Sequence, residues 1–368
     1  MHVMITANMA WNIQNFRRPL LASLVAEGYR VSVLAPPDDS VAELEASGCR
    51  FLPLAMNMKG LNPFEGLRLW RRFATVFRRE RPDVVLSFTI KNNLFGAMAA
   101  RGTGTPFIPN VTGLGTAFLS GGALQTVAET LYRRAFAPLR VIFFQNEDDR
   151  DLFLRRRLAR PDQARVLPGS GIDLTRFAAA PPPPPGAPPV FLMIARLLRD
   201  KGVVEFVEAA RRIRAHTPTA RFQLLGAAGA ENRTAIDAAT VRAWVDEGVV
   251  EHLGVTPDVR PFIAAADCVV LPSYREGAPR TLIEAAAMGR PLIATDVPGC
   301  RAVVERDVTG FLCAPRDADS LAAAMRRFLD APPEARTAMG RAGRAKMERE
   351  YDEALVVGAY RDAIARAT

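Results

Sequence analysis

The sequence has few of the residues that build disulfide frameworks, metal centres or membrane spans. Its 368 residues include three histidines and four cysteines, which stand too far apart for a CxxC redox pair or a metal knuckle. We interpret each cysteine as a small buried hydrophobe. No apolar run approaches the roughly 18 residues that a spanning helix needs. The first residues lead into a strand without a basic leader. These absences predict a cytosolic protein, or one attached only to a membrane surface.

The charge is unevenly distributed along the chain. The formal net charge is +9, and almost all of the excess lies within residues 1–180. This asymmetry indicates an anionic partner for the N-terminal half, such as phosphates, a lipid surface or nucleic acid. An arginine-rich genome explains it equally well. Because no aromatic-interleaved basic motif or known nucleic-acid module is present, we expect no nucleic-acid partner.

Length and proline content predict two domains. Residues 181–189 hold seven prolines and one glycine, which is typical of a stiff linker. We therefore expect an N-terminal domain over 1–180, a linker over 181–189 and a C-terminal domain over 190–343. The remaining residues, 344–368, form an amphipathic helix that we expect to pack back on the N-terminal domain.

Both halves alternate short apolar runs with amphipathic stretches, which predicts parallel sheets covered on both faces. We therefore expect an α/β protein with two facing Rossmann-like domains and a cleft between them. The predicted strands are 3–6, 31–35, 84–88, 107–110 and 141–145 in the first half and 190–194, 221–225, 268–272 and 291–295 in the second.

One predicted helix, 62–81, has two interpretations. It places a stripe of aromatic and aliphatic residues opposite several arginines; the stripe is Phe64, Leu67, Trp70, Phe73 and Phe77. Such a helix can lie in a membrane interface, or it can simply cover a sheet. We favour a core helix whose basic edge touches lipid headgroups. Residues 123–139 have the same pattern.

The strongest motif is 273–284, which directly follows a predicted strand. It therefore lies at the carboxyl end of a parallel strand, where open α/β sheets bind ligands. Gly277 permits close backbone approach, and Pro279 suits the first turn of the next helix, whose N-terminus attracts phosphate. Glu276 and Glu284 are acceptor-only carboxylates suited to sugar and ribose hydroxyls.

A second motif, 194–202, follows the first strand of the C-terminal half. Arg196 and Lys201 lie at another strand end, where both side chains can reach a diphosphate. Solvated loop charges are the alternative for either residue alone, but their pairing at a strand end favours a functional site.

Together these motifs resemble the donor site of the retaining glycosyltransferases of family 4, which have the GT-B fold. The resemblance rests on Arg196, Lys201 and the Glu276-x7-Glu284 spacing. It extends to residues 226–229, 253–255 and 171–173 with Phe177, and so covers nearly the whole chain. Closest are enzymes that add N-acetylgalactosamine to undecaprenyl-diphosphate-linked sugars, which share phrases at 61–64, 113–115, 193–196 and 271–274.

The resemblance implies a role for each motif. Arg196 and Lys201 would hold the donor diphosphate, Glu276 the donor sugar and Glu284 the ribose. Backbone over 277–280, including Gly277, Ala278 and Arg280, would assist the phosphate, and the loops at Gly226 and Val255 would hold the nucleotide. Arg196, Lys201 and Glu276 would be the catalytic set. Family members retain anomeric configuration, with the leaving diphosphate accepting the acceptor proton. The donor would be a UDP-sugar carrying N-acetylgalactosamine or a related N-acetylhexosamine.

Two features depart from many relatives. Residues 7–12 replace a glycine-rich loop, and no histidine stands near the expected reacting centre, where 110–113 reads Asn-Val-Thr-Gly. The undecaprenyl-diphosphate subgroup shares the missing histidine. For the lipid-linked acceptor the candidates follow N-domain strands; they are Asn15, Arg17, Lys91, Asn92 and Thr112. This assignment, with an anionic membrane surface as partner, predicts a cytoplasmic enzyme peripherally associated with the inner membrane.

We expect no metal and no cofactor. Asp317 and Asp319 have DxD spacing but precede a helix that begins near Ser320, which is typical of capping. Asp148, Asp149 and Asp151 likewise open a helix. Two other enzymatic interpretations remain: a non-hydrolysing sugar-nucleotide epimerase on the same architecture, and a transferase acting on a soluble acceptor.

Overall fold

A computed structural model describes residues 1–57, 63–114, 122–184, 186–229, 232 and 234–367. Leu61 and Asn62, part of one phrase shared with the family, lie outside the described residues. The chain forms two compact units. Unit 1 comprises residues 1–171 and 353–368, and unit 2 comprises residues 172–352. Each unit is an α/β domain built on a parallel sheet, which confirms the predicted fold class.

Unit 1 is built on a seven-stranded sheet with the order β3-β2-β1-β4-β5-β6-β7, and each pair of neighbours is parallel. The strands are β1 (His2–Thr6), β2 (Arg30–Ala35), β3 (Arg50–Pro53), β4 (Val84–Phe88), β5 (Phe107–Val111), β6 (Ile142–Phe144) and β7 (Ala164–Val166). The helices are α1 (Ala10–Ala26), α2 (Val41–Ala46), α3 (Pro63–Glu80), the π-helix η1 (Asn92–Gly96), α4 (Ala97–Thr103), α6 (Gly122–Phe136), α7 (Glu147–Arg155) and α15 (Glu353–Ala367).

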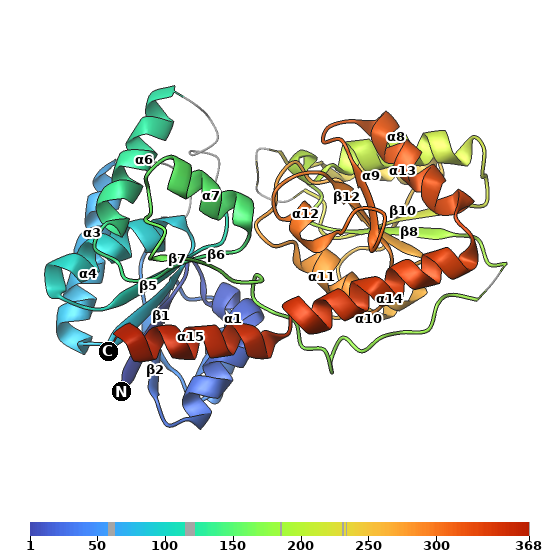
Figure 1. Cartoon of the computed structure of the whole chain (residues 1–368). Helices are drawn as coiled ribbons and strands as arrows, with labels where there is room; N and C mark the ends of the chain where they lie inside the picture. Colours follow the sequence, from blue (N-terminus) through green and yellow to red (C-terminus); the bar gives the residue numbers. More distant parts are fainter. Residues whose placement is uncertain (58–62, 115–121, 185, 230–231, 233, 368) are drawn as a thin grey trace. The chain divides into compact units, whose positions relative to one another are not determined.

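Helices cover both faces of this sheet (Figure 1). Alternate residues of β1 point to opposite faces, as the two-residue period of a strand requires. Val3 and Ile5 join the core beneath α1 and α15, whereas Met4 joins the core beneath α3, α4 and α6. The strands are therefore buried on both sides, which explains why they are continuous apolar runs in the sequence.

Unit 2 repeats this plan with a six-stranded parallel sheet in the order β10-β9-β8-β11-β12-β13. Its strands are β8 (Val190–Ile194), β9 (Arg221–Leu225), β10 (Glu251–His252), β11 (Cys268–Leu271), β12 (Leu292–Thr295) and β13 (Gly310–Cys313). Its helices are η2 (Arg199–Lys201), α8 (Val203–Arg214), α9 (Ala238–Asp246), α10 (Arg260–Ala265), α11 (Arg280–Ala287), α12 (Cys300–Val303), α13 (Ala318–Asp330) and α14 (Pro333–Glu350).

The chain passes between the units at residues 171/172 and 352/353, not at the proline-rich segment. Residues 181–189 belong to unit 2, where the Arg290 guanidinium donates to the carbonyl of Pro181. The N–H of Ala180 also donates to Met288 O at 3.1 Å. A run of prolines makes a segment stiff, but it need not mark a boundary between units. Here the stiff segment belongs to unit 2.

The C-terminal residues form two helices where the sequence predicts one. Helix α14 belongs to unit 2 and α15 to unit 1. Between them the carbonyl of Tyr351 accepts the N–H of Ile172 at 2.8 Å, so the two connecting segments lie side by side. Tyr360 and Val356 of α15 are buried in the core of unit 1.

Helix α3 covers the sheet, and part of its predicted stripe is exposed. Leu69, Phe73 and Phe77 are buried against the sheet, so the helix is part of the core. Phe64 and Leu67 point outward instead and are 74% and 44% exposed. The predicted aromatic stripe therefore divides into a buried part and an exposed part near the helix N-terminus.

At the start of β1, His2 is buried and held in its neutral form. Arg30 Nη2 lies 2.9 Å from His2 Nδ1, and Ser32 Oγ lies 2.8 Å from Nε2. Because a guanidinium only donates, Nδ1 must accept and Nε2 must carry the proton. Burial and then Arg30 lower the pKa of His2, against the opposing carboxylates of Glu80 and Asp83.

We predict that unit 1 loses stability as the pH falls from 7.5 to 5.5. The unfolded chain binds a proton near the ordinary histidine pKa of about 6.5, whereas native His2 resists it. The free energy of unfolding should therefore decrease by up to about 1.4 kcal/mol per pH unit below that value. Urea unfolding across this range measures the slope. His2→Gln should flatten it, and an equal slope in the variant contradicts the assignment.

Candidate active site

The order of strands in unit 2 identifies one position for a ligand. From β8 the chain continues to β9 and β10 on one side, and then returns to β11 on the other. Open α/β sheets bind ligands at such a reversal, outside the carboxyl ends of the strands. Arg196 and Lys201 follow β8, and Glu276 and Gly277 follow β11. The two predicted motifs therefore occupy the two sides of the reversal.

Three backbone contacts join the loops that follow β8 and β11. The carbonyl of Asp200 accepts the N–H of Tyr274 at 2.9 Å and the hydroxyl of Ser273 at 3.2 Å. Gly202 has φ +78°, and a Cβ there would lie 2.1 Å from the carbonyl oxygen of Pro272. Glycine is therefore required at 202 both by its backbone conformation and by the space available.

These contacts bring Lys201 and Glu276 together. The Lys201 ammonium lies 2.5 Å from Glu276 Oε1, and the two side chains are 24% and 13% exposed. On the other side of Glu276, Gly299 has φ +81°, and a Cβ there would lie 2.6 Å from the carbonyl oxygens of Glu276 and Gly277. Residues from three consecutive strand ends thus fix one partly buried ion pair.

The second carboxylate of the motif is almost fully buried. Glu284 is 8% exposed and accepts a hydrogen bond from Arg280 Nε at 2.6 Å. Burial raises the pKa of the Glu284 carboxyl, while Arg280 and Arg176 act in the opposite direction. Nearby, Arg260 pairs with Asp258 through two hydrogen bonds and lowers the pKa of Asp258 to about 2. Glu284 is therefore a carboxylate kept out of water in a strongly charged neighbourhood.

Helix α11 directs its N-terminus to the same edge of the sheet. Its N-cap is Pro279, whose side chain has no hydrogen-bonding atom, and the Thr281 hydroxyl donates to the carbonyl of Ile194 at the end of β8. Ala278, just before this helix, is partly exposed. Backbone N–H groups and the helix dipole at such an end favour an anion.

The remaining predicted donor residues lie along the same edge. Arg196 is exposed. Gly226, after β9, packs so closely that a Cβ would lie 1.8 Å from the carbonyl oxygen of Ala195, and its N–H donates to Gly254 O at 2.7 Å. Val255 follows and is 73% exposed. All the donor candidates therefore belong to one edge of one sheet.

The acceptor candidates lie in unit 1, and burial divides them. Arg17 is 4% exposed, with its guanidinium 4.1 Å from the centre of the Phe88 ring, and Asn92 is fully buried. Because both side chains are buried, we expect them to position neighbouring groups and not to contact an acceptor directly. Lys91 is partly exposed and donates to the carbonyl of Asn57 at 2.7 Å, and burial lowers the pKa of its ammonium. Asn15 is exposed and Thr112 partly exposed.

Sequence reasoning missed the residues that hold the two loops. Asp200 and Ser273 act through a backbone carbonyl and a short hydroxyl, and neither has a distinctive spacing. Tyr274 donates its hydroxyl to Glu205 at 2.6 Å, which ties the loop after β11 to α8. Glycine at 202, directly after a charged turn, is the one signal that could have indicated the close approach.

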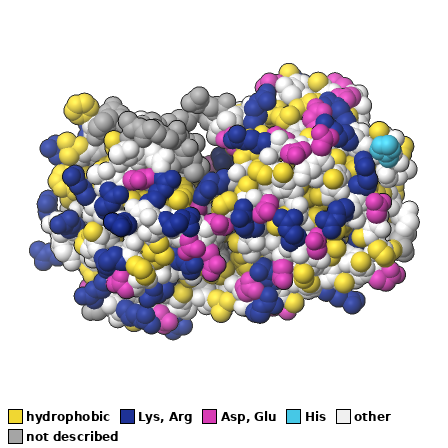
Figure 2. Space-filling view, turned by 45° about the horizontal axis from the view of Figure 1, so that its top comes forward, with side chains coloured by type: hydrophobic (Ala, Val, Ile, Leu, Met, Phe, Trp, Pro, Cys, Tyr) yellow, Lys and Arg dark blue, Asp and Glu magenta, His cyan; other side chains and the backbone are white. Residues whose placement is uncertain are grey.

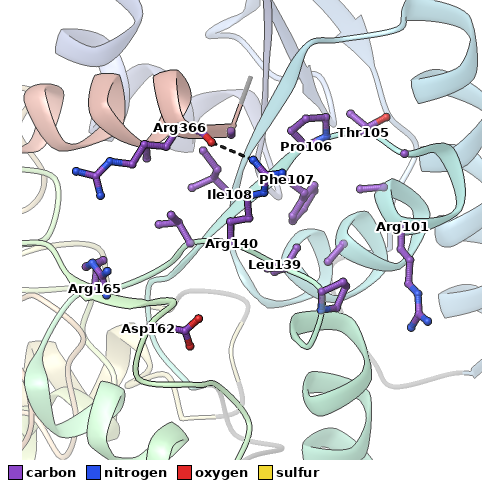
Figure 3. A pocket seen from close by; sticks show the side chains of 17 residues that line it. Arg101, Thr105, Pro106, Phe107, Ile108, Leu139, Arg140, Asp162, Arg165 and Arg366 are labelled. Atoms are coloured by element: carbon purple, nitrogen blue, oxygen red, sulfur yellow. Dashed lines mark hydrogen bonds between the residues drawn. The ribbon is translucent and has the colours of Figure 1, made fainter.

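A cavity of about 550 Å³ lies at the opposite, amino edge of the unit 1 sheet (Figure 3). Apolar residues such as Ile108 and Leu139 form its walls, and four arginines line it: Arg101, Arg140, Arg165 and Arg366. Arg101 and Arg366 stand in the last turns of α4 and α15, where cations complement the helix dipole. None of the predicted site residues lines this cavity.

The predicted cap of α13 is confirmed, since Asp317 accepts the N–H of Ser320 at 2.8 Å. At α7 the cap is Asn146; Asp148 and Asp149 stand in the first turn, and Asp151 lies beyond it. Within the described ranges, no group of three His, Cys, Asp or Glu side chains is placed to hold a metal ion. No helix in the described part of the chain is long and apolar enough to cross a membrane.

We predict that Gly202→Ala destabilises unit 2 more than Gly248→Ala does. Both glycines have φ in the left-handed region, but a Cβ at Gly248 would meet nothing within 4 Å. Gly248→Ala should therefore cost about 1 kcal/mol in backbone strain alone. Gly202→Ala must also displace the Pro272 carbonyl. Denaturant unfolding of both variants measures the difference, and equal losses would show that the close approach is readily relieved.

Two family descriptions match the chain. "Glycosyl transferase 4-like domain" matches residues 13–169, and "Glycosyl transferases group 1" matches residues 188–331. The first match falls in unit 1 and the second in unit 2. The second contains both motifs of the candidate site.

Relatives and solved structures agree with these matches. The chain is 27% identical over 326 residues to the N,N'-diacetylbacillosaminyl-diphospho-undecaprenol alpha-1,3-N-acetylgalactosaminyltransferase of Campylobacter jejuni, with 84% of each chain covered. It is 28% identical over 311 residues to the UDP-Gal:alpha-D-GlcNAc-diphosphoundecaprenol alpha-1,3-galactosyltransferase of Escherichia coli, with 80% of this chain and 76% of the relative covered. The structure of Anabaena HepE with UDP-glucose aligns over 100% of both chains with a TM-score of 0.79 and 16% identity.

The family matches, the curated relatives and the paired Rossmann-like units lead to one identification. The chain belongs to the group 1, family 4-like glycosyltransferases of the GT-B fold, and its activity is the transfer of a sugar.

Proposed function

We propose that this transferase moves an N-acetylhexosamine, N-acetylgalactosamine or a close relative, from a UDP-sugar to a polyprenyl-diphosphate-linked saccharide in cell-surface glycan assembly. The observation that carries the donor half is the Lys201–Glu276 pair at the strand reversal of unit 2. The acceptor class is supported by the two relatives, whose names specify undecaprenyl-diphosphate-linked sugars.

The donor diphosphate is proposed to bind between the N-terminus of α11 and the loop after β8. Arg196 is exposed there, and Lys201 supplies a second cation from the same loop. Cations and helix N–H groups at this position stabilise the negative charge that grows on the diphosphate as the sugar leaves. The cationic side chains thus supply the positive charge that a divalent ion provides in metal-dependent transferases, which supports a metal-independent reaction.

The two carboxylates are proposed to recognise hydroxyl groups. Glu276 would accept hydrogen bonds from the donor sugar, in exchange for part of its contact with Lys201. Glu284 would accept them from the ribose, while Arg280 holds its carboxylate in place. An ionised carboxylate has only acceptor sites, so donors from a bound ribose stabilise a group whose burial disfavours the charge. Exposed Val255 offers an apolar surface to the base.

The proposed transfer retains anomeric configuration, as the family resemblance implies. The bond between the sugar C1 and the donor phosphate oxygen breaks, and C1 bonds to the acceptor hydroxyl oxygen on the same face. The hydroxyl proton passes to the departing diphosphate oxygen, so the reaction needs no base from the protein.

A membrane surface on the cytoplasmic side of the inner membrane is the proposed location of the acceptor. Helix α3 supports this proposal with exposed Phe64 and Leu67 beside exposed Arg68, Arg71 and Arg72. Apolar and basic side chains together favour an interface with anionic lipid. On the face of the molecule in Figure 2, Lys and Arg side chains are interleaved with Asp and Glu.

We predict that Lys201→Ala and Glu276→Gln each lower kcat/KM for sugar transfer by at least about 100-fold, because each removes a charged contact to the donor. The matched controls are Arg211→Ala and Glu247→Gln, which break a partly exposed ion pair between α8 and the C-cap of α9. These should keep their activity. Transfer is measured with a panel of UDP-sugars and a short-chain prenyl-diphosphate N-acetylhexosamine, and circular dichroism monitors folding. Full activity in either site variant refutes its role.

We further predict that the rate is unchanged in excess EDTA and that the product keeps the anomeric configuration of the donor, as NMR coupling constants report. Loss of activity in EDTA with recovery by Mg²⁺, or an inverted product, would contradict these two features while leaving transfer intact. Conversion of the UDP-sugar to an epimer without acceptor would instead favour the epimerase alternative.

A further inference from the structure

Unit 1 has its own strand reversal, and its residues point to a second binding site. From β1 the chain continues to β2 and β3 on one side, then returns to β4 on the other. The carboxyl ends of β1 and β4 lead into residues 7–11 and 89–93. By the rule that located the donor motifs in unit 2, this edge of the unit 1 sheet should also meet a ligand.

The backbone at this reversal is unusual. Thr89 has φ +73°, a left-handed conformation that is uncommon and costly for a β-branched residue. The π-helix η1 begins three residues later, and short π-helices are frequent at functional sites. The buried amide of Asn92 donates to Thr6 Oγ1 at 2.8 Å and to Ala7 O at 3.0 Å. The segments after β1 and β4 are therefore fixed against one another.

This fixed edge presents an exposed aromatic ring. Trp11, in the first turn of α1, is 47% exposed. The backbone N–H of Trp11 donates to Asp38 Oδ2 at 2.8 Å, and the Phe16 ring meets the indole edge-on with centroids 5.5 Å apart. The indole thus belongs to a regular helix and has a defined neighbour. A half-exposed tryptophan forgoes much of the free energy that burial would supply, and tryptophan is enriched at binding interfaces.

Three asparagines, Asn8, Asn12 and Asn15, lie close to Trp11 in the sequence. Asn15 is one helical turn after Trp11 on the same face and is exposed, and Asn12 is partly exposed. The Asn8 side-chain oxygen is buried without a hydrogen-bond partner in the described part of the chain. Turning that amide toward a ligand hydroxyl therefore breaks no hydrogen bond of the oxygen. An aromatic face with neighbouring amides matches a saccharide, which has an apolar C–H face and a rim of hydroxyls.

We propose that Trp11 is the stacking platform for the saccharide of the acceptor, with Asn8 and Asn15 at the hydroxyl rim. The inference rests on the proposed function, because it assigns the sugar part of the proposed acceptor to unit 1. The ring takes the C–H face of the sugar nearest the transfer point, and the amides fix its orientation. Trp11 is thus a positioning residue for the acceptor and takes no part in the donor site.

The test compares Trp11→Ala, Trp11→Phe and the control Leu355→Ala, which removes an exposed aliphatic side chain of α15 in the same unit. Trp11→Ala should raise the KM for a short-chain prenyl-diphosphate disaccharide roughly tenfold. The KM for the UDP-sugar and the Kd for UDP should not change. Trp11→Phe should recover most of the acceptor KM, and Leu355→Ala should match the wild type. An unchanged acceptor KM in Trp11→Ala overturns the proposal, as does an equal rise in both substrates' KM.

A binding measurement makes the test independent of turnover. The disaccharide without lipid should change the tryptophan fluorescence of the wild type, and Trp11→Phe should abolish that change. Prenyl diphosphate without sugar should leave the signal unaltered. If it produces the same change, the platform binds the lipid instead and the saccharide assignment fails. If the wild type transfers no sugar to any lipid-linked acceptor, the proposed function fails, and the fluorescence titration alone decides whether Trp11 binds saccharide.

Discussion

The close approach of the loops after β8 and β11 is the constraint on which the proposed donor site depends. One carbonyl, that of Asp200, accepts donors from both Ser273 and Tyr274, and Gly202 leaves room for the Pro272 carbonyl. Without these contacts the sheet alone would not bring Lys201 to Glu276, because the two residues are 75 positions apart in the sequence. The ion pair is therefore a consequence of backbone packing, and its partly buried position follows from the same loops. Because the ion pair depends on this backbone packing, Gly202 matters as much for it as Lys201 and Glu276 do.

The two units use one topological device for different chemistry. In each, the chain reverses beside the central first strand, and the two loops at that point are joined by backbone or amide hydrogen bonds. At its strand reversal, unit 2 has a lysine, an arginine and carboxylates around a helix N-terminus, and these groups suit a diphosphate and its sugar. At its own reversal, unit 1 has an exposed indole and asparagines, which suit a neutral hydroxyl-rich surface. The proposed division of labour between donor and acceptor thus rests on the chemistry of the residues at each reversal.

The strands and the donor motifs could be predicted because both leave local signals. A strand buried on two faces is a short apolar run, and the residues after it lie at the ligand edge, so the sequence alone predicts one edge for Glu276 and Lys201. Arg17 shows where this reasoning stops: it follows a strand, but the register of α1 turns it inward against Phe88, and no local pattern reports that. The unit boundary was misplaced for a similar reason. Proline density reports stiffness, whereas the crossing at 171/172 depends on which surface residues 172–189 pack against.

Helix dipoles account for where part of the charge lies, but they favour acids and bases alike and so do not account for the net excess of +9. In a parallel α/β unit every helix N-terminus lies at the carboxyl edge of the sheet and every C-terminus at the amino edge. Helix dipoles therefore select acids such as Glu147, Asp148 and Asp149 at one edge, and bases such as Arg101 and Arg366 at the other. The arginine-lined cavity of unit 1 lies at that amino edge, away from the strand reversal. Of its four arginines, Arg101 and Arg366 are accounted for by helix stability. The proposed membrane partner therefore rests on α3, where exposed Phe64 and Leu67 stand beside exposed arginines outside the last turn of the helix.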